Sequence, residues 1–368
     1  MRDKEGRKDT LPFIFSISEL KRHLSLSKRK TREINDTSRV YPLKIPLFYL
    51  NLIDKNNPLC PIRRQCIPDT KELSGEGEQD PLVEEKHSIT PSFIKKYPGR
   101  GVFLTGTQCA LYCRFCNRKR LAGKDGEIKA SHEDTFRYIE KDPSIKEVIV
   151  SGGDPIMLPP EELDNILFRI SSIDHIKLIR ISSRVPLVYP EGVKKAHLDA
   201  FKRIKPLWLI IHINHPKEIT KEFAENVRML REAGCIMLSH SVLLRGVNDC
   251  PITLANLFEG LVLLGIKPYY LFQLDEAKGA MHFKVQLKKG IEIMSALRKN
   301  ISGIAMPFYT IDITGGVGKV PMDYGYIKKM EDEKIYIEDF NGNTGVYFDD
   351  GKKSICMGCG ICNKKSMA

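Results

Sequence analysis

The chain has 368 residues, of which 42% are hydrophobic and 28% are charged, with a formal net charge of +12 and ten cysteines. This composition is ordinary for a globular protein, and no apolar run approaches the ~20 residues of a membrane helix, which argues against a membrane protein. The first residues lack the apolar segment of a secretion signal, so we expect a cytoplasmic protein whose cysteines bind metals rather than form disulfides.

The positive charge does not by itself indicate a nucleic-acid-binding protein. Lys and Arg are dense in the first 32 residues, but elsewhere they are interspersed with acidic residues, and no nucleic-acid-binding motif accompanies them. We therefore expect no nucleic-acid partner, and interpret the charge as a solvated basic surface that also attracts anionic cofactors.

Residues 1–100 are predicted to form an N-terminal extension of helical and irregular structure. The first 40 residues are polar and helix-like, and Ser16 to Glu19 has the pattern of a capping box, in which two side chains satisfy free N–H groups at a helix start. Residues 41–100 are rich in Pro and turn residues, and residues 75–80 are predicted to be a surface loop.

From Gly101 the pattern changes to alternating strands and helices. We predict strands at 101–107, 147–151, 176–182, 207–213, 236–244 and 268–274, and helices that include 160–171, 219–233 and 252–264. Such alternation builds βαβ units with parallel strands, so the predicted fold class is α/β, a partial, open (β/α)6 barrel over residues 101–302. In barrels of this kind the chemistry lies at the C-terminal ends of the strands.

Residues 303–368 are predicted to form a small C-terminal part. It begins with a strand at 306–313 and a Gly-rich loop that ends at Lys319, and it continues with hairpin strands at 334–338 and 344–348. The tail carries Cys356, Cys359 and Cys362 in a C-x2-C-x2-C array, which indicates a metal site.

A second group of cysteines follows the first barrel strand. Cys109, Cys113 and Cys116 form a C-x3-C-x2-C array. Three thiolates can hold three irons of a [4Fe–4S] cluster, and the fourth iron is then open to a ligand that is not protein. This spacing, followed by aromatic and basic residues, is similar to the signature of radical S-adenosylmethionine (SAM) enzymes. The alternative is three cysteines that pack or store metal.

Two glycine-rich turns are further candidates for cofactor binding. Ser151, Gly152, Gly153 and Asp154 follow the second strand, where radical SAM enzymes have a turn that holds the methionine amino group of SAM; alone, such a turn more often only connects a strand to a helix. The loop before Lys319 is not a P-loop, because Val320 stands where Ser or Thr is required. A lysine on such a loop can bind a carbonyl cofactor such as pyridoxal phosphate (PLP); the alternative is a plain turn with a solvated lysine.

Six segments in chain order resemble the lysine 2,3-aminomutases, a family of PLP-dependent radical SAM enzymes: CALYCRFCNRKR, SGGDP, HINHPKEIT, SVLLRGVNDC, FQLDEAKGAMHF and D-x2-GGVGK-x-P. The resemblance implies that Lys319 binds PLP and that Tyr97 and Arg100 contact it. It also implies that Arg118 pairs with the substrate carboxylate, and that Asp275 and Asp312 bind the distal ammonium group of lysine. His240 stands near the cofactors, where the family usually has glutamine.

The resemblance further implies zinc bound by the cysteine tail together with Cys250 of the VNDC motif. The spacing of the tail differs from the C-x-C-x2-C of the family, so a second iron–sulfur cluster remains an alternative. We expect a homo-oligomer, in which Cys250 and the tail come from neighbouring subunits.

The activity implied by the resemblance is conversion of L-lysine to β-lysine (3,6-diaminohexanoate), with an electron donor such as flavodoxin or ferredoxin. One alternative is an aminomutase that acts on another amino acid or supplies β-lysine for modification of a translation factor. Another is a catalytically silent iron–sulfur or zinc protein that keeps the fold.

Overall fold

The computed structural model describes residues 12–121, 125–204, 206–316, 318–323, 325–331, 334–339 and 341–348. The chain divides into two compact units, Met1–Met322 and Asp323–Ala368. The first unit holds the N-terminal extension, all barrel strands and Lys319, so each candidate site residue up to Lys319 lies within one unit.

The first unit is built around a 10-stranded sheet in the order β12-β11-β10-β9-β8-β7-β6-β5-β4-β3. Strands β5 through β11 are parallel, whereas β12 pairs antiparallel with β11, and β3 and β4 continue antiparallel from β5. The strands are β3 (Ser88–Thr90), β4 (Phe93–Tyr97), β5 (Arg100–Leu104), β6 (Glu147–Ser151), β7 (Leu178–Ser183), β8 (Leu207–His212), β9 (Cys235–Leu243), β10 (Lys267–Gln273), β11 (Phe308–Ile313) and β12 (Gly318–Pro321). This arrangement confirms the α/β class and the partial, open barrel.

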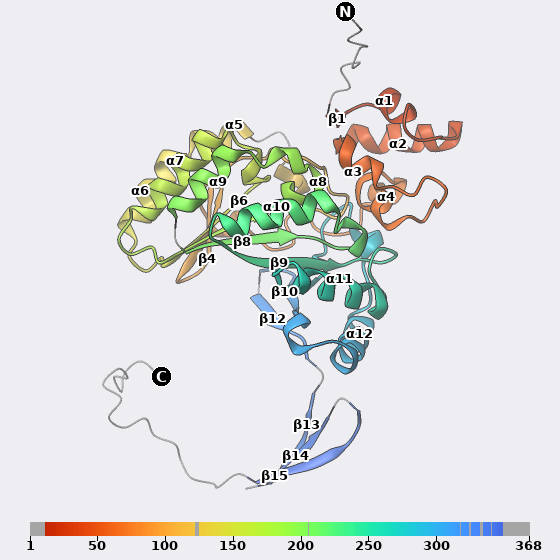
Figure 1. The fold of residues 1–368 in the computed structure, drawn as a ribbon, viewed down its shortest axis with the longest axis vertical. Coiled ribbons are helices and arrows are strands. Elements are labelled where there is room, and N and C mark those ends of the chain that lie inside the picture. Colours follow the sequence, from red (N-terminus) through yellow and green to blue (C-terminus); the bar gives the residue numbers. More distant parts are fainter. Residues whose placement is uncertain are drawn as a thin grey trace, which may run out of the picture. The chain divides into compact units, whose positions relative to one another are not determined.

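Helices connect the parallel strands, because a parallel neighbour can be reached only by a long crossover. They are α5 (Asp125–Ala130), α6 (His132–Lys141), α7 (Pro160–Ser171), α8 (Val185–Val188), α9 (Lys195–Arg203), α10 (Lys221–Glu232), α11 (Pro251–Leu263) and α12 (Leu287–Asn300). Figure 1 shows α7 beside α9, and α8 beside α10, along the sheet. Local sequence fixes where they begin: Thr220, for example, accepts a hydrogen bond from the N–H of Phe223 (3.1 Å) at the start of α10.

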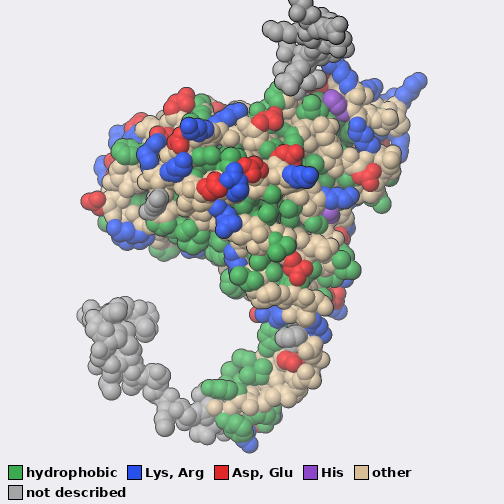
Figure 2. All heavy atoms as spheres, in the orientation of Figure 1, with side chains coloured by type: hydrophobic (Ala, Val, Ile, Leu, Met, Phe, Trp, Pro, Cys, Tyr) green, Lys and Arg blue, Asp and Glu red, His purple; other side chains and the backbone are tan. Residues whose placement is uncertain are grey.

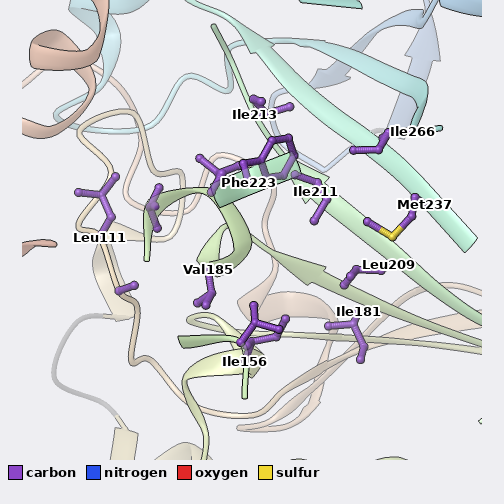
Figure 3. Close-up of a cluster of buried hydrophobic side chains, with 14 of the residues drawn as sticks. Leu111, Ile156, Ile181, Val185, Leu209, Ile211, Ile213, Phe223, Met237 and Ile266 are labelled. Atoms are coloured by element: carbon purple, nitrogen blue, oxygen red, sulfur yellow. The ribbon is translucent and has the colours of Figure 1, made fainter. Parts of the chain in front are cut away.

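A continuous apolar layer lies between the strands and these helices. Figure 3 shows side chains of this layer, which include Ile181, Leu209, Ile211 and Met237 from the strands, Val185 from α8 and Phe223 from α10. Leu111, two residues after Cys109, is part of the same cluster of buried side chains. The loop that carries the three cysteines is therefore anchored in the main core.

The N-terminal extension is more regular than the sequence indicates. It contains β1 (Phe13–Ile14), α1 (Ile17–Lys21), α2 (Lys28–Val40), β2 (Ile45–Pro46), α3 (Leu47–Asn51) and α4 (Pro61–Cys66). The predicted capping box is confirmed: Ser16 accepts from the N–H of Glu19, and the Glu19 carboxylate accepts from the N–H of Ser16.

Buried ion pairs attach this extension to the cysteine loop. The guanidinium group of Arg114 donates to both carboxylate oxygens of Glu72, with a shortest distance of 2.6 Å, and to the carbonyl of Pro42 (2.9 Å). The Lys119 ammonium reaches the same carboxylate at 2.9 Å. Arg114 and Glu72 are almost fully buried, so removal of the Glu72 carboxylate would leave the guanidinium of Arg114, and the ammonium of Lys119 beside it, without this counter-charge in the interior.

The described part of the second unit is an antiparallel sheet of β13 (Ile327–Glu331), β14 (Lys334–Glu338) and β15 (Thr344–Phe348). The hairpin of β14 and β15 agrees with the sequence prediction. Large apolar side chains on this sheet are exposed, including Met330 (64%) and Phe348 (67%). Figure 2 shows hydrophobic side chains gathered on it.

Candidate functional site

Two cavities lie at the barrel strands of the first unit, and Arg118 lines both of them. The first, of about 570 Å³, is lined by Lys319, Tyr97, Arg100, His240 and Asp312 among others. The second, of about 350 Å³, is lined by Cys109, Cys113 and Cys116 together with Gly152 and Gly153. The structure thus collects most of the candidate residues into two adjacent spaces, and their functional roles stay predictions.

The wall of the second cavity suits an iron–sulfur cluster. Burial raises the pKa of the Cys109 thiol well above its ordinary value, and the negative charges of Asp154, Cys116 and Cys113 raise it further. Burial and Cys113 likewise raise the pKa of Cys116. Thiolates that disfavour one another in this way become stable together when a shared cation neutralises them, which an iron cluster does.

The Gly-Gly turn after β6 fits tightly against the cysteine loop. The N–H of Gly153 donates to the carbonyl of Gly106 (2.6 Å), and the N–H of Asp154 donates to that of Gln108 (2.7 Å). A Cβ atom on Gly153 would lie 2.2 Å from the Gln108 carbonyl oxygen, and Gly152 has a φ of +118°, which favours glycine. The sequence therefore needs glycine at both positions to bring the two loops together.

Asp154 and Ser151 do not line the second cavity. The buried carboxylate of Asp154 accepts hydrogen bonds from the hydroxyl of Ser183 (2.7 Å) and the N–H of Arg184 (2.6 Å), both at the end of β7. Ser151 lies 3.4 Å from a guanidinium nitrogen of Arg118. In the structure Asp154 joins the ends of two strands, and SAM contact by its carboxylate stays a prediction.

Lys319 lines the first cavity. Its ammonium nitrogen lies 3.2 Å from Oδ2 of Asp312, the residue opposite it in the β11–β12 pair, and 4.3 Å from the ring centre of Phe272. Burial lowers the pKa of Lys319 from its ordinary value, although Asp312 and Asp275 act in the opposite direction. A lysine with a lowered pKa is better able to react as a neutral nucleophile with a carbonyl group.

Polar atoms without partners show that the first cavity is built for a polar ligand. Within the described residues, the buried His240 Nε2 and Trp208 Nε1 atoms lack a hydrogen-bond partner, and both residues line the cavity. Burial and the charge of Lys319 lower the pKa of His240 well below its usual range, so the ring is neutral. Arg100, whose guanidinium lies 4.2 Å from the ring centre of Tyr97, adds positive charge. These residues fit a phosphorylated aromatic cofactor such as PLP.

Arg118 has a partner that the sequence analysis missed. Glu84 accepts from its Nε (3.0 Å) and one Nη (2.7 Å), and also from Arg120 (2.9 Å). Burial alone would raise the pKa of Glu84, but the charges and hydrogen bonds of Arg118 and Arg120 outweigh it and hold the pKa at about 2. In the sequence, the acids from Asp80 to Glu85 complement the basic run Arg118–Arg120 in charge, but this signal does not say which residues pair.

Asp275 lies close enough to Asp312 for their charges to interact. Burial raises the pKa of Asp275 to about 6, with Asp312 as the second cause, while a hydrogen bond from the Asn117 side chain (2.7 Å) opposes the rise. Asp312 and Lys319 line the first cavity, and Asp275 lies close enough to both for their charges to interact, so the two carboxylates together are complementary to a cation.

Cys250 lies apart from these cavities, directly before α11, and its thiol is partly exposed. Cys356, Cys359 and Cys362 lie outside the described residues. In the portion of the chain that the structure describes, no group of three or more His, Cys, Asp or Glu side chains is placed to hold a metal ion, and no helix is long and apolar enough to cross a membrane.

Comparison with known proteins agrees with this geometry. Residues 103–258 match the Radical SAM superfamily. The chain is 34% identical to the L-lysine 2,3-aminomutase of Clostridium subterminale, over 96% of this chain and 86% of that protein. It is 35% identical to the L-lysine 2,3-aminomutase of Escherichia coli (83% and 90%) and 32% identical to the glutamate 2,3-aminomutase of Clostridioides difficile (89% and 80%). The chain therefore belongs to the lysine 2,3-aminomutase family and is a radical SAM isomerase.

Proposed function

We propose that this protein moves the amino group of L-lysine from C2 to C3 and forms β-lysine. Cys109, Cys113 and Cys116 would hold a [4Fe–4S] cluster, with SAM beside them in the second cavity against Gly152 and Gly153. PLP would be held by Lys319, Tyr97, Arg100 and His240 in the first. When bound, the cluster and SAM would supply radical chemistry at C3 of the substrate, and PLP would supply the π-system needed for migration of the nitrogen.

The observation that carries the choice of lysine is the set of charges at the first cavity. Arg118 lines this cavity; its Nε and one Nη are bonded to Glu84, and its other Nη lies 3.4 Å from the Ser151 hydroxyl, which leaves N–H groups of the guanidinium for a substrate carboxylate. Asp312 also lines the cavity, and together with the neighbouring Asp275 it would form a site for a cation.

Lys319 strengthens this argument. In the ligand-free structure its ammonium group neutralises Asp312. Asp275 adds a second negative charge beside this pair, so the distal ammonium of a bound lysine would supply the cation that balances it. A glutamate side chain would instead bring a third negative charge to the two aspartates. Hydrogen bonds between charged groups contribute about 1.5–3 kcal/mol each, so two of them favour lysine over a neutral amino acid of the same shape by orders of magnitude.

The test is anaerobic turnover of lysine, ornithine, arginine, glutamate and alanine by the protein loaded with cluster, SAM and PLP. We expect L-lysine to be the preferred substrate, and expect Asp275→Asn and Asp312→Asn to lose at least tenfold in kcat/KM for it. Asp199→Asn, which changes an exposed aspartate on α9, is the matched control and should keep full activity. Preference for glutamate or alanine would refute the proposal.

The remaining parts of the proposal concern partners and location. We propose that flavodoxin or ferredoxin supplies the electron, that the protein acts in the cytoplasm, and that zinc binds Cys250 together with Cys356, Cys359 and Cys362 in a homo-oligomer. The family relationship and the chemistry of four thiols support these assignments.

A further inference from the structure

A buried arginine from outside the cysteine loop reaches one of the three cysteines. Arg184 lies directly after β7, at the start of α8, and its Nη1 atom is 2.9 Å from Sγ of Cys113. Among the described residues, the sulfur atoms of the three cysteines accept one further hydrogen bond, from the backbone N–H of Arg118 to Cys116 (3.4 Å). Arg184 therefore contributes a full positive charge where the other donor contributes only a backbone dipole.

The position of Arg184 is fixed by buried partners. Its Nη2 atom donates to Oε1 of Glu218 (2.6 Å) and to the side-chain carbonyl of Gln65 (3.3 Å). Glu218 is fully buried; its second oxygen accepts from the N–H groups of Asn214 and His215 (2.8 Å each). The hydroxyl of Tyr49 donates to Oε1 of Glu218 at 2.7 Å.

Two elements of this network belong to the N-terminal extension. Tyr49 comes from α3 and Gln65 from α4, whereas Arg184 and Glu218 come from the connections after β7 and β8. The extension thus holds the guanidinium group from one side and the barrel holds it from the other. Burial would lower the pKa of Arg184, but the negative charges of Cys113 and Glu218 raise it, so the group keeps its proton.

We propose that Arg184 is a positioning residue that raises the reduction potential of the cluster held by Cys113, and that the charge of Glu218 lowers this potential. Reduction by one electron makes the cluster and its thiolates more negative by one charge. A cation that donates N–H to a cluster thiolate stabilises this reduced form more than the oxidised form and raises the potential. The carboxylate of Glu218 acts in the opposite sense. This inference rests on the cluster and not on lysine as the substrate.

The test is a redox titration of the anaerobically reconstituted protein, followed by electron paramagnetic resonance without SAM or amino acid. We expect Arg184→Met to make the cluster about tenfold harder to reduce at a fixed potential, a shift of about −59 mV for one electron. Glu218→Gln, which leaves the arginine charge unopposed, should shift the potential upward. Tyr49→Phe removes one hydrogen bond and no charge. At the same fixed potential, it should therefore change the ratio of reduced to oxidised cluster by less than threefold.

The opposite signs separate a charge effect from disturbed packing. Loosened packing would admit water in both variants and move both potentials in the same direction. Equal potentials in all variants, or shifts of the same sign, would overturn the proposal. If Arg184→Met fails to take up a cluster, the Glu218→Gln shift decides alone: an upward shift supports the proposal and its absence refutes it. Failure of lysine turnover would leave these measurements unaffected.

Discussion

Among single residues, Asp275 should give the clearest dependence on pH. Its pKa is about 6 in the ligand-free structure because burial and Asp312 disfavour the charged form. In the proposed function a substrate ammonium would bind the ionised carboxylate of Asp275, so protons would compete with lysine. We expect lysine affinity to be constant above about pH 6 and to fall about tenfold for each unit below it.

The measurement is equilibrium titration of lysine binding to the enzyme loaded with cluster, SAM and PLP, from about pH 5 to about pH 8. In Asp275→Asn the acidic fall should disappear, because the titrating group is gone, while affinity at neutral pH becomes lower. Asp199→Asn should keep the wild-type profile. An unchanged acidic fall in Asp275→Asn would assign the titration to a different group.

Candidate site residues could be predicted from the sequence where they belong to a short motif. The three cysteines, the Gly-Gly turn and Lys319 each belong to a local pattern, and the structure gathers them into two cavities that share Arg118. Glu84 and Arg184 could not be found in this way. Glu84 is 34 positions from Arg118, and Arg184 is 71 positions from Cys113, so only the folded sheet shows that they touch.

At the scale of elements, the Gly-Gly turn after β6 allows a direct test of close packing. Gly153→Ala would place a Cβ atom 2.2 Å from the Gln108 carbonyl oxygen, and the contact is with backbone that cannot rotate away. We expect a loss of about 1–3 kcal/mol in the free energy of unfolding, because overpacking forces the cysteine loop to shift. SAM affinity should fall with it.

Chemical denaturation and SAM binding measure the two effects. Gly126→Ala is the control, since a Cβ atom there meets no other atom within 4 Å and the residue lies in α5. Its stability should be equal to wild type or slightly higher, because alanine favours helix. Equal behaviour of Gly153→Ala and Gly126→Ala would mean that the turn tolerates a side chain and that its glycines do not position the loop.

The same scale shows which elements sequence patterns can identify. The six predicted barrel strands correspond to β5 through β10, and the helix predicted at 160–171 is α7 with the same bounds. In these strands buried residues alternate with half-buried ones, many of which line the first cavity, so one face supplies apolar residues at regular spacing. The hairpin of β3 and β4 was missed because Phe93–Tyr97 contains two lysines and lies beyond the parallel strands, where its pattern resembles irregular chain.

At the scale of the whole molecule, the apolar surface of the second unit needs an explanation. Its described sheet exposes large apolar side chains, among them Ile327, Val346 and Tyr347, and the apolar face of a sheet is normally buried against another layer. The homo-oligomer and the zinc site of the proposal address this together, because a metal that joins two chains would link the tail to another surface.

Cys250 is the residue through which this can be tested. Hydrogen bonds from the backbone of Thr253 and Ile252 lower the pKa of its thiol, which favours the thiolate that zinc binds. We expect wild-type protein to contain one zinc ion per chain, and Cys250→Ala to lose zinc and to form a smaller assembly. The measurements are metal analysis and light scattering of the cluster-loaded protein.

Cys235→Ala is the control for this experiment. Burial raises the pKa of Cys235 to about 12, so this thiol serves packing, and its loss should leave zinc and assembly unchanged. Zinc retained at full occupancy in Cys250→Ala, with the assembly unchanged, would show that the tail binds metal without Cys250. Iron in excess of that in the first cluster, with no zinc, would favour a second iron–sulfur cluster, which the C-x2-C-x2-C spacing leaves open.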